Sequence, residues 1–288
     1  MSTITEYYPK AFNNNSVVVE RFSSAEEVVR VNSQRKLTRK SYKRHSHIED
    51  GNYSKYFHGV KSWDEAKDLM TYGYSPFVKE LQSKIDYTAK GDGVKTAFRN
   101  DVVGFAPIVP LMLAGVPNCM INMYKKPVKN KVINIYFDKV AVCDKTSKQI
   151  EEACAKLMSA IIEAENQGYR VNLYITEAHT DWDKTVDMMI LKVKDSNTPL
   201  DLQRLSFPLA HPAFFRVFGF EWFIRCPKAR YRDGLGHNLS REYSHEQIVN
   251  AYEEMFKEKC IVFEMEDIIT ESEKSIVDSI LYANNKYI

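Results

Sequence analysis

From residue 131 onward, the apolar positions predict strands and helices in alternation. Residues 132–137 (V-I-N-I-Y-F) are rich in β-branched and aromatic side chains, which favours a strand. Apolar residues at helical spacing follow, with Thr146 and Gln149 placed to form a capping box and Gly168 suited to the helix end. Residues 169–175 predict the next strand. This order predicts two parallel strands joined by a right-handed crossover.

The alternation continues to the C-terminus. We predict a third strand at 186–193, two short helices in 199–219 broken at Pro208 and Pro212, a capped helix from Ser244 to Lys257, a strand at 260–263 and a final helix capped near Thr270. The fold class is therefore α/β: a C-terminal Rossmann-like, mostly parallel sheet flanked by helices.

The N-terminal part is predicted to be mainly helical. A short β-type run at 17–19 precedes a helix that Ser24 and Glu27 can cap. Ser62 begins a further helix that ends at Gly73, and another helix starts at residues 75–76. We divide the chain into an N-terminal segment at 1–60 with a basic, loosely ordered stretch, a mainly helical region at 61–130 and an α/β domain at 131–288.

Residues 101–117 (D-V-V-G-F-A-P-I-V-P-L-M-L-A-G-V-P) are the most apolar part of the chain. Their three prolines and two glycines exclude one long helix. We predict a short buried helix or loop around 110–114 that belongs to the core or covers a sheet. A partner-binding patch is the alternative.

Composition narrows the class of protein without naming a function. Hydrophobic residues make up 44% of the 288 and charged residues 27%, as in ordinary water-soluble domains. No apolar run approaches the roughly 20 residues of a membrane helix, and no signal-peptide core is visible at the N-terminus. Five cysteines without a C-x-x-C pair favour a reducing compartment. We expect no membrane partner.

A net charge of +2 conceals an uneven distribution. Residues 241–278 hold eleven acids against four bases, whereas residues 34–44 hold six bases and no acid. Such a basic segment could neutralise nucleic-acid phosphates, aided by a second basic cluster at 225–232. The alternative, which we favour, is a solvated linker. The candidate nucleic-acid-binding residues are Arg35, Lys36, Arg39, Lys40, Lys43 and Arg44.

A metal site is a further hypothesis, because ligands of open α/β sheets bind beyond the carboxyl ends of the strands. Oxygen ligands of the kind that Mg²⁺ and Ca²⁺ prefer follow the first two strands of the α/β domain. The candidates are Asp138, Asp144, Thr146 and Glu177. The same residue types also serve as helix caps and turn formers. We therefore expect no cofactor, with a divalent metal as the alternative.

Asp201, Arg204 and His211 could line one rim of a pocket. A buried, hydrogen-bonded core histidine is the interpretation that we favour for His211, since it lies among apolar residues. The sequence contains no Walker A loop, G-x-G-x-x-G, G-x-S-x-G or H-E-x-x-H motif. These absences leave ATPase, dinucleotide oxidoreductase, α/β-hydrolase and zincin activities unsupported.

Several segments together resemble an uncharacterised family of tailed bacteriophages and related mobile elements. They are S-W-D-E-A at 62–66 with Gly73, V-P-L-M-L-A-G-V-P at 109–117, G-Y-R-V at 168–171 and P-L-D-L-Q-R-L-S-F-P-L-A-H-P at 199–212. The resemblance implies a viral protein of the host cytoplasm or the virion. It implies no activity.

The α/β domain also resembles the von Willebrand A topology. The metal site of that fold requires D-x-S-x-S after the first strand, whereas this chain has Asp138 followed by K-V-A-V. The resemblance therefore implies a protein-interaction scaffold.

Three functions remain as hypotheses at this stage. The first is a phage-encoded protein-interaction or assembly protein without catalytic activity. The second is nucleic-acid binding through residues 35–44, and the third is metal-dependent hydrolysis at the strand-end carboxylates.

Overall fold

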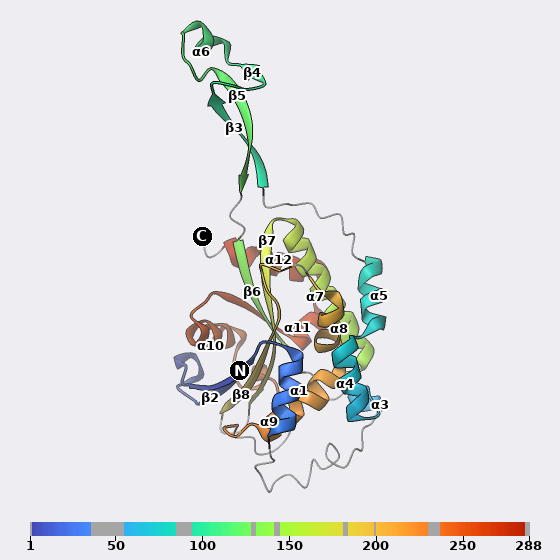
Figure 1. Cartoon of the computed structure of the whole chain (residues 1–288). Coiled ribbons are helices and arrows are strands. Elements are labelled where there is room, and N and C mark those ends of the chain that lie inside the picture. The colour runs from blue at the N-terminus through green and yellow to red at the C-terminus, as the bar shows by residue number, and fades with distance from the viewer. Residues whose placement is uncertain are drawn as a thin grey trace.

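The computed structural model shows a layered α/β body from which a β-ribbon arm, residues 94–127, projects (Figure 1). The body comprises the other described residues. The structure describes residues 2–35, 55–84, 94–127, 131–140, 145–180, 184–198, 200–229 and 237–285.

A six-stranded sheet in the order β1-β2-β8-β7-β6-β9 forms the centre of the body. Its strands are β1 (Thr3–Tyr7), β2 (Val17–Phe22), β6 (Lys131–Asp138), β7 (Tyr169–Thr180), β8 (Val186–Lys194) and β9 (Cys260–Glu264). Three neighbouring pairs are parallel, namely β2–β8, β6–β7 and β6–β9, and two are antiparallel. The expected α/β class with a mostly parallel, helix-flanked sheet is confirmed.

The predicted strand–helix–strand unit consists of β6, α7 (Ser147–Asn166) and β7. The Thr146 hydroxyl accepts the Gln149 amide at 3.3 Å, and the Gln149 side chain accepts the Thr146 amide at 3.0 Å, which completes the capping box. Strands β6 and β7 are parallel, as predicted. The third strand, β8, is present but runs antiparallel to β7, with Thr180 opposite Val186.

The N-terminal strands complete the same sheet. Strand β2 pairs with β8 in parallel, and β1 pairs with β2. Helix α1 (Ala25–Gln34) follows, and the Ser24 side chain accepts the Glu27 amide as predicted. One sheet therefore joins two strands of the expected 1–60 segment to four strands of the expected 131–288 domain.

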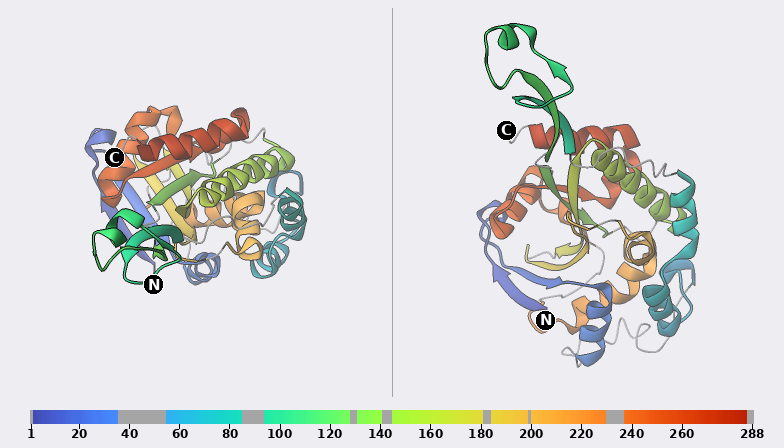
Figure 2. Two further views of the ribbon diagram at one scale, coloured as in Figure 1. Left: turned by 90° about the horizontal axis from the view of Figure 1, so that it is seen from above. Right: turned by 45° about the horizontal axis from the view of Figure 1, so that its top comes forward.

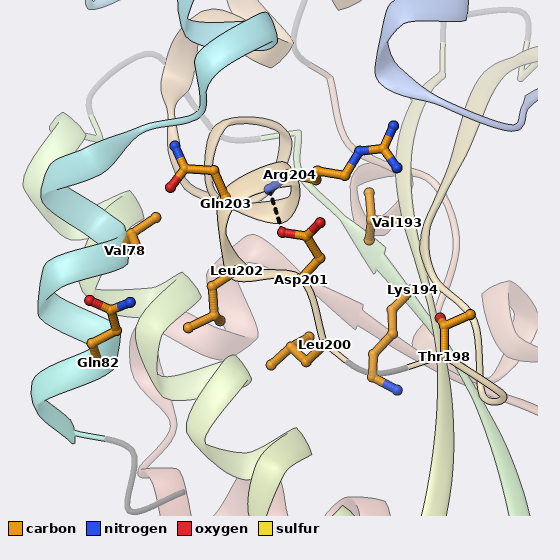
Figure 3. Close-up of a pocket in the computed structure, with 10 residues that line it drawn as sticks. All are labelled: Val78, Gln82, Val193, Lys194, Thr198, Leu200, Asp201, Leu202, Gln203 and Arg204. Carbon is orange, nitrogen blue, oxygen red and sulfur yellow. Dashed lines mark hydrogen bonds between the residues drawn. The ribbon is translucent and has the colours of Figure 1, made fainter.

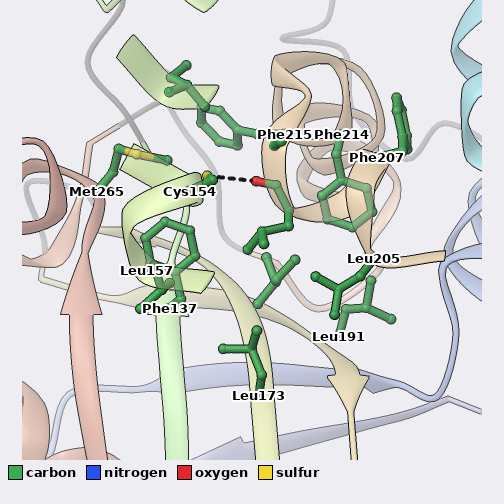
Figure 4. Close-up of a cluster of buried hydrophobic side chains, with 14 of the residues drawn as sticks. Phe137, Cys154, Leu157, Leu173, Leu191, Leu205, Phe207, Phe214, Phe215 and Met265 are labelled. Carbon is green, nitrogen blue, oxygen red and sulfur yellow. Dashed lines mark hydrogen bonds between the residues drawn. The ribbon is translucent and has the colours of Figure 1, made fainter. Parts of the chain in front are cut away.

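Helices cover the two faces of the sheet unequally (Figure 2). The larger cluster of buried side chains lies under α1, α4 (Trp63–Tyr72), α5 (Ser75–Lys84), α7, α11 (Met265–Thr270) and α12 (Glu273–Asn285). Figure 4 shows its centre, where the Cys154 thiol of α7 contacts the Leu209 carbonyl at 3.1 Å. On the other face, η1 (Lys10–Phe12), η4 (Leu239–Arg241) and α10 (His245–Phe256) cover a smaller cluster. No helix of the described residues is long and apolar enough to cross a membrane.

The proline-containing segment differs from its prediction. Helix α8 (Leu202–Ala210) continues through Pro208 and ends at His211, whose ψ is 131°. The residue before a proline avoids the helical region, so Pro212 and not Pro208 causes the break. A π-helical turn, η3 (Phe214–Gly219), then leads into α9 (Phe220–Arg225).

The arm corrects two further expectations. It contains β3 (Val94–Asp101), β4 (Ala106–Pro107), α6 (Val109–Leu113) and β5 (Met120–Pro127), so the region 61–130 is mainly helical only in its first part, and α3 (Lys55–His58) precedes that region. The predicted short helix exists as α6, but none of its residues is buried. The prediction of a buried segment was wrong, because high apolar content does not specify which surface covers it.

Candidate functional site

Exposed apolar side chains concentrate on the arm. Among the described residues, ten of the fourteen large hydrophobic side chains that are exposed belong to it. They are Phe98, Val102, Val103, Phe105, Val109, Met112, Leu113, Val116, Met123 and Tyr124. Proteins that act alone in water rarely expose contiguous apolar patches of more than a few hundred Å². This concentration marks the arm as the candidate functional site.

The arm ribbon has one apolar face and one polar face. Residues directly opposite in an antiparallel pair share a face, and β3 places Phe98 opposite Met123. Phe105 lies beside Phe98, with ring centroids 6.2 Å apart. We define the apolar arm face as Phe98, Phe105, Ile121 and Met123, and the exposed Asn100, opposite Ile121, is a polar residue on the same face.

The opposite face of the ribbon holds a polar network. Arg99 forms an ion pair with Asp101 at 2.8 Å, and the Asn122 side chain donates to Asp101 at 3.3 Å. The Arg99 guanidinium also lies 5.3 Å from the centre of the Tyr124 ring. This face is suited to water, whereas the apolar arm face is suited to a dry contact.

The tip of the arm satisfies much of its backbone internally. The Ile108 amide donates to Cys119 at 2.6 Å, and the Phe105 amide donates to Ile121 at 2.9 Å. A Cβ on Gly104 would lie 2.2 Å from the Ile121 carbonyl oxygen, so only glycine permits this close approach. A tip with paired backbone groups and apolar side chains can enter an apolar contact at little desolvation cost.

A second unusual group of side chains is buried beneath η3. Lys139 and Glu177 are 1% and 0% exposed. The Lys139 ammonium donates to the carbonyls of Pro208 and His211 at 2.7 Å each, where α8 ends. Both Glu177 carboxylate oxygens accept no hydrogen bond from a described residue, and a Cβ on Gly219 would lie 1.6 Å from one of them.

Burial dominates the ionisation of this pair. It lowers the pKa of Lys139 to about 8, and it raises the pKa of Glu177 well above its usual value while Lys139 opposes that rise. The two hydrogen bonds of Lys139 hold the end of α8 against the sheet. Both side chains are closed to solvent, so they present no chemistry at the surface.

The three candidate metal ligands that the structure describes, Asp138, Thr146 and Glu177, do not lie together on one face. Asp138 is in register with Thr176, which faces Tyr252 of α10, whereas Glu177 faces η3 on the other side of the sheet. Burial and then Glu264 raise the pKa of Asp138. Thr146 caps α7, and Asp144 lies outside the described residues. The described residues contain no group of three or more His, Cys, Asp or Glu that could hold a metal.

The basic candidates fall mostly outside the described residues, which include only Arg35 of the six. Its guanidinium binds both carboxylate oxygens of Glu20, at 2.7 and 2.6 Å. The Trp222 indole also donates to Glu20 at 2.7 Å, and the Arg225 side chain donates to the Arg35 carbonyl at 2.7 Å. Arg35 therefore anchors the end of α1 and does not present a free cation.

Two of the three pocket candidates line a cavity of about 690 Å³ (Figure 3). The Asp201 side chain caps α8 by accepting the Arg204 amide at 3.1 Å. The Arg204 side chain reaches Glu26 at 3.7 Å, and Lys194 in the cavity wall is paired with Glu165 at 2.6 Å. Its charged groups therefore already have protein partners.

His211 is not part of that cavity. It is 5% exposed, and its Nδ1 accepts the Ala213 amide at 3.1 Å. Burial, reinforced by Lys139, lowers its pKa to about 3. The interpretation as a buried, hydrogen-bonded core histidine is confirmed.

One comparison with known proteins identifies a family. The family model described as Domain of unknown function (DUF7192) matches residues 4–281. The chain belongs to this family. No curated protein and no solved structure matches it. The matched range spans both the body and the arm.

Sequence reasoning missed the arm ribbon, although one signal was available. Residues 102–124 contain no Asp, Glu, Lys or Arg. Lys139 was also missed, because a lysine after a strand ordinarily faces solvent.

Proposed function

We propose that this protein is a non-enzymatic protein-interaction or assembly protein that binds through its arm. The observation that carries the proposal is the concentration of exposed apolar side chains on the arm, ten of fourteen among the described residues. Covering a large apolar side chain stabilises a complex by about 1.5–3 kcal/mol when burial is complete. The body needs no such cover, because its own clusters are buried.

The ribbon itself also supports this function. The arm is a narrow sheet in the order β3-β5-β4, whose third strand, β4, pairs with β5 through only two residues. Packing against another surface gives such a small sheet the burial that it lacks alone. The arm pairs β3 with β5 over eight residues, and no arm element makes an extended contact with a described element of the body. A partner that covers the apolar arm face would supply that burial.

Affinity capture tests the proposal. The full chain is compared with a double variant of the apolar arm face, Phe98→Ser with Met123→Ser, and with Asn122→Ser on the polar face as a control. We expect a partner to be retained by the full chain and the control and lost by the double variant. Equal recovery by all three chains would refute the arm as the binding surface.

The proposal also includes the place where the protein acts, the host cytoplasm or the virion, and a Rossmann-like fold for its sheet. The four segments that resemble a phage family favour the host cytoplasm or the virion. The order β8-β7-β6-β9, with α7 crossing between β6 and β7, supports a Rossmann-like, von Willebrand A-like scaffold. Detection of the chain in purified virions, or its absence from them, would distinguish the two settings.

A further inference from the structure

We propose that the end of the arm, residues 106–117, inserts into the interfacial zone of an anionic lipid bilayer while the body stays in water. We call these residues the arm tip. The inference goes beyond the proposed function, whose protein partner is tested on the ribbon at Phe98 and Met123, outside the arm tip. Contact with the surface of a bilayer requires no helix that spans it.

The arm tip exposes apolar side chains with no polar side chain among them. Residues 102–117 are all apolar. No residue of the arm tip is buried, and its exposed large side chains are Val109, Met112, Leu113 and Val116, with Leu113 at 83%. An interface with another protein ordinarily surrounds its apolar centre with a polar rim, which this segment does not supply. A uniformly apolar projection is instead suited to the acyl region of a bilayer.

The backbone of the arm tip is hydrogen-bonded within the arm. Its amides donate to arm carbonyls at 2.6–3.1 Å, in the pairs Ile108 to Cys119, Met112 to Ile108, Ala114 to Pro110, Gly115 to Met112 and Val116 to Leu111. Three of its twelve residues are prolines, which have no amide hydrogen. Lipid cannot satisfy a free amide, whereas water or a protein partner can, so this internal bonding favours lipid as the surroundings.

The net charge of the arm selects an anionic bilayer. Residues 94–127 contain four bases against one acid, Asp101, which is paired with Arg99 at 2.8 Å. The rest of the chain has 36 bases against 37 acids, so the arm alone has a clear excess of positive charge. An apolar segment accompanied by bases complements a surface of anionic headgroups over an acyl interior. The four bases are Lys95, Arg99, Lys125 and Lys126.

The arm separates these charges from its tip by a suitable distance. Figure 1 shows α6 at the end of the arm farthest from the body, so the arm tip can meet a flat surface before the body does. Met120 pairs with Pro107 of the arm tip, and Lys125 lies five residues farther along β5, about 17 Å away at roughly 3.4 Å per residue. With the arm tip about 5–10 Å deep, that position lies about one Debye length above the headgroups in 0.1 M salt.

Vesicle flotation of the full chain tests the inference. Vesicles of phosphatidylcholine mixed with phosphatidylglycerol are compared with vesicles of phosphatidylcholine alone. We expect tighter binding to the anionic vesicles, and we expect added salt to weaken it. Met112→Glu with Leu113→Glu should lower the affinity at least about 100-fold, because the burial of each side chain contributes about tenfold or more.

A control pair with the same added charge lies on the body. Tyr72 and Tyr282 are 70% and 68% exposed, and Tyr72→Glu with Tyr282→Glu should bind vesicles like the wild type. All four replaced side chains are exposed, so both variants should keep the circular dichroism spectrum of the wild type.

Depth is measured with a tryptophan placed on the arm tip. The fluorescence of Leu113→Trp should shift to shorter wavelength on anionic vesicles and be quenched by brominated acyl chains. Tyr282→Trp on the body should show neither change beyond the wild type.

The contrary outcomes are distinct. A chain that binds neither kind of vesicle overturns the inference, and so does binding that the tip variant retains or that both variants lose equally. A captured protein that the tip variant loses, with no vesicle binding by the wild type, would overturn it in favour of a protein on the arm tip. The proposed function fails separately, when capture is independent of Phe98 and Met123.

Discussion

Phe137 in the body and Phe98 in the arm are the same side chain in opposite surroundings. Phe137 is fully buried between β6 and the helices of the larger cluster, whereas Phe98 is 61% exposed on a ribbon. The body satisfies its apolar residues within one copy of the chain. The arm leaves them uncovered, so burial within one copy of the chain accounts for the apolar residues of the body but not for those of the arm.

The largest expected difference between the regions is in stability. Phe137→Ala should lower the free energy of unfolding by about 3–5 kcal/mol, because it opens a cavity in the core. Phe98→Ala should change it by less than about 0.5 kcal/mol, since an exposed side chain stabilises the monomer little. Urea denaturation followed by circular dichroism measures both, and equal losses would contradict the distinction.

A pH dependence should belong to the body. Glu177 keeps its proton when folded, because burial raises its pKa above the ordinary 4.5, whereas the unfolded chain loses that proton. As pH rises above about 4.5, Glu177 therefore contributes a fall of about 1.4 kcal/mol per pH unit to the free energy of unfolding until its folded pKa is reached, whereas the buried His211 contributes a rise up to about pH 6.5. Glu177→Gln should remove this slope, and wild type and variant should converge at pH 4.

Urea midpoints measured from pH 4 to pH 8 check this expectation. Glu246→Gln, on the exposed side of α10, is the matched control and should leave the slope unchanged. An unaltered slope in Glu177→Gln would show that the buried carboxyl is not protonated in the folded chain.

A small stability effect should come from the largest change in the chain. Replacing residues 94–127 with a short Gly-Ser linker removes the arm, which makes no extended contact with a described element of the body. We expect the free energy of unfolding to change by less than about 1 kcal/mol, because surface changes away from packed groups cost little. Thermal unfolding monitored by calorimetry tests this, and a loss above about 3 kcal/mol would mean that the arm supports the body.

Local signals in the sequence predicted local structure well. Ser24, Ser62, Thr146 and Ser244 each cap the helix that they were expected to begin, because a cap depends on residues three positions apart. The order of the sheet depends on contacts between distant residues. The joining of β2 to β8 therefore could not be inferred from periodicity.

The predicted metal ligands show the same limit of prediction from sequence, which does not reveal contacts between distant residues. Asp138 is the last residue of β6, but Glu177 lies within β7, which continues to Thr180, and does not follow the strand as expected. The two side chains face opposite sides of the sheet. Successive side chains of a strand point to opposite faces, so knowledge of the register of β6 and β7 would have predicted that these two carboxylates face opposite sides. For residues 101–117, apolar content predicted burial, whereas only the structure shows that one copy of the chain leaves them uncovered.

Hydrogen exchange along the full chain tests the central claim most directly, that the arm is the binding surface. Amides of residues 94–127 are followed in dilute protein, in concentrated protein and with a captured partner, with β6 and β7 as the internal reference. We predict that exchange in the arm slows at least tenfold in the bound state while the reference strands do not change. Arm exchange that is the same in all three samples would contradict the account.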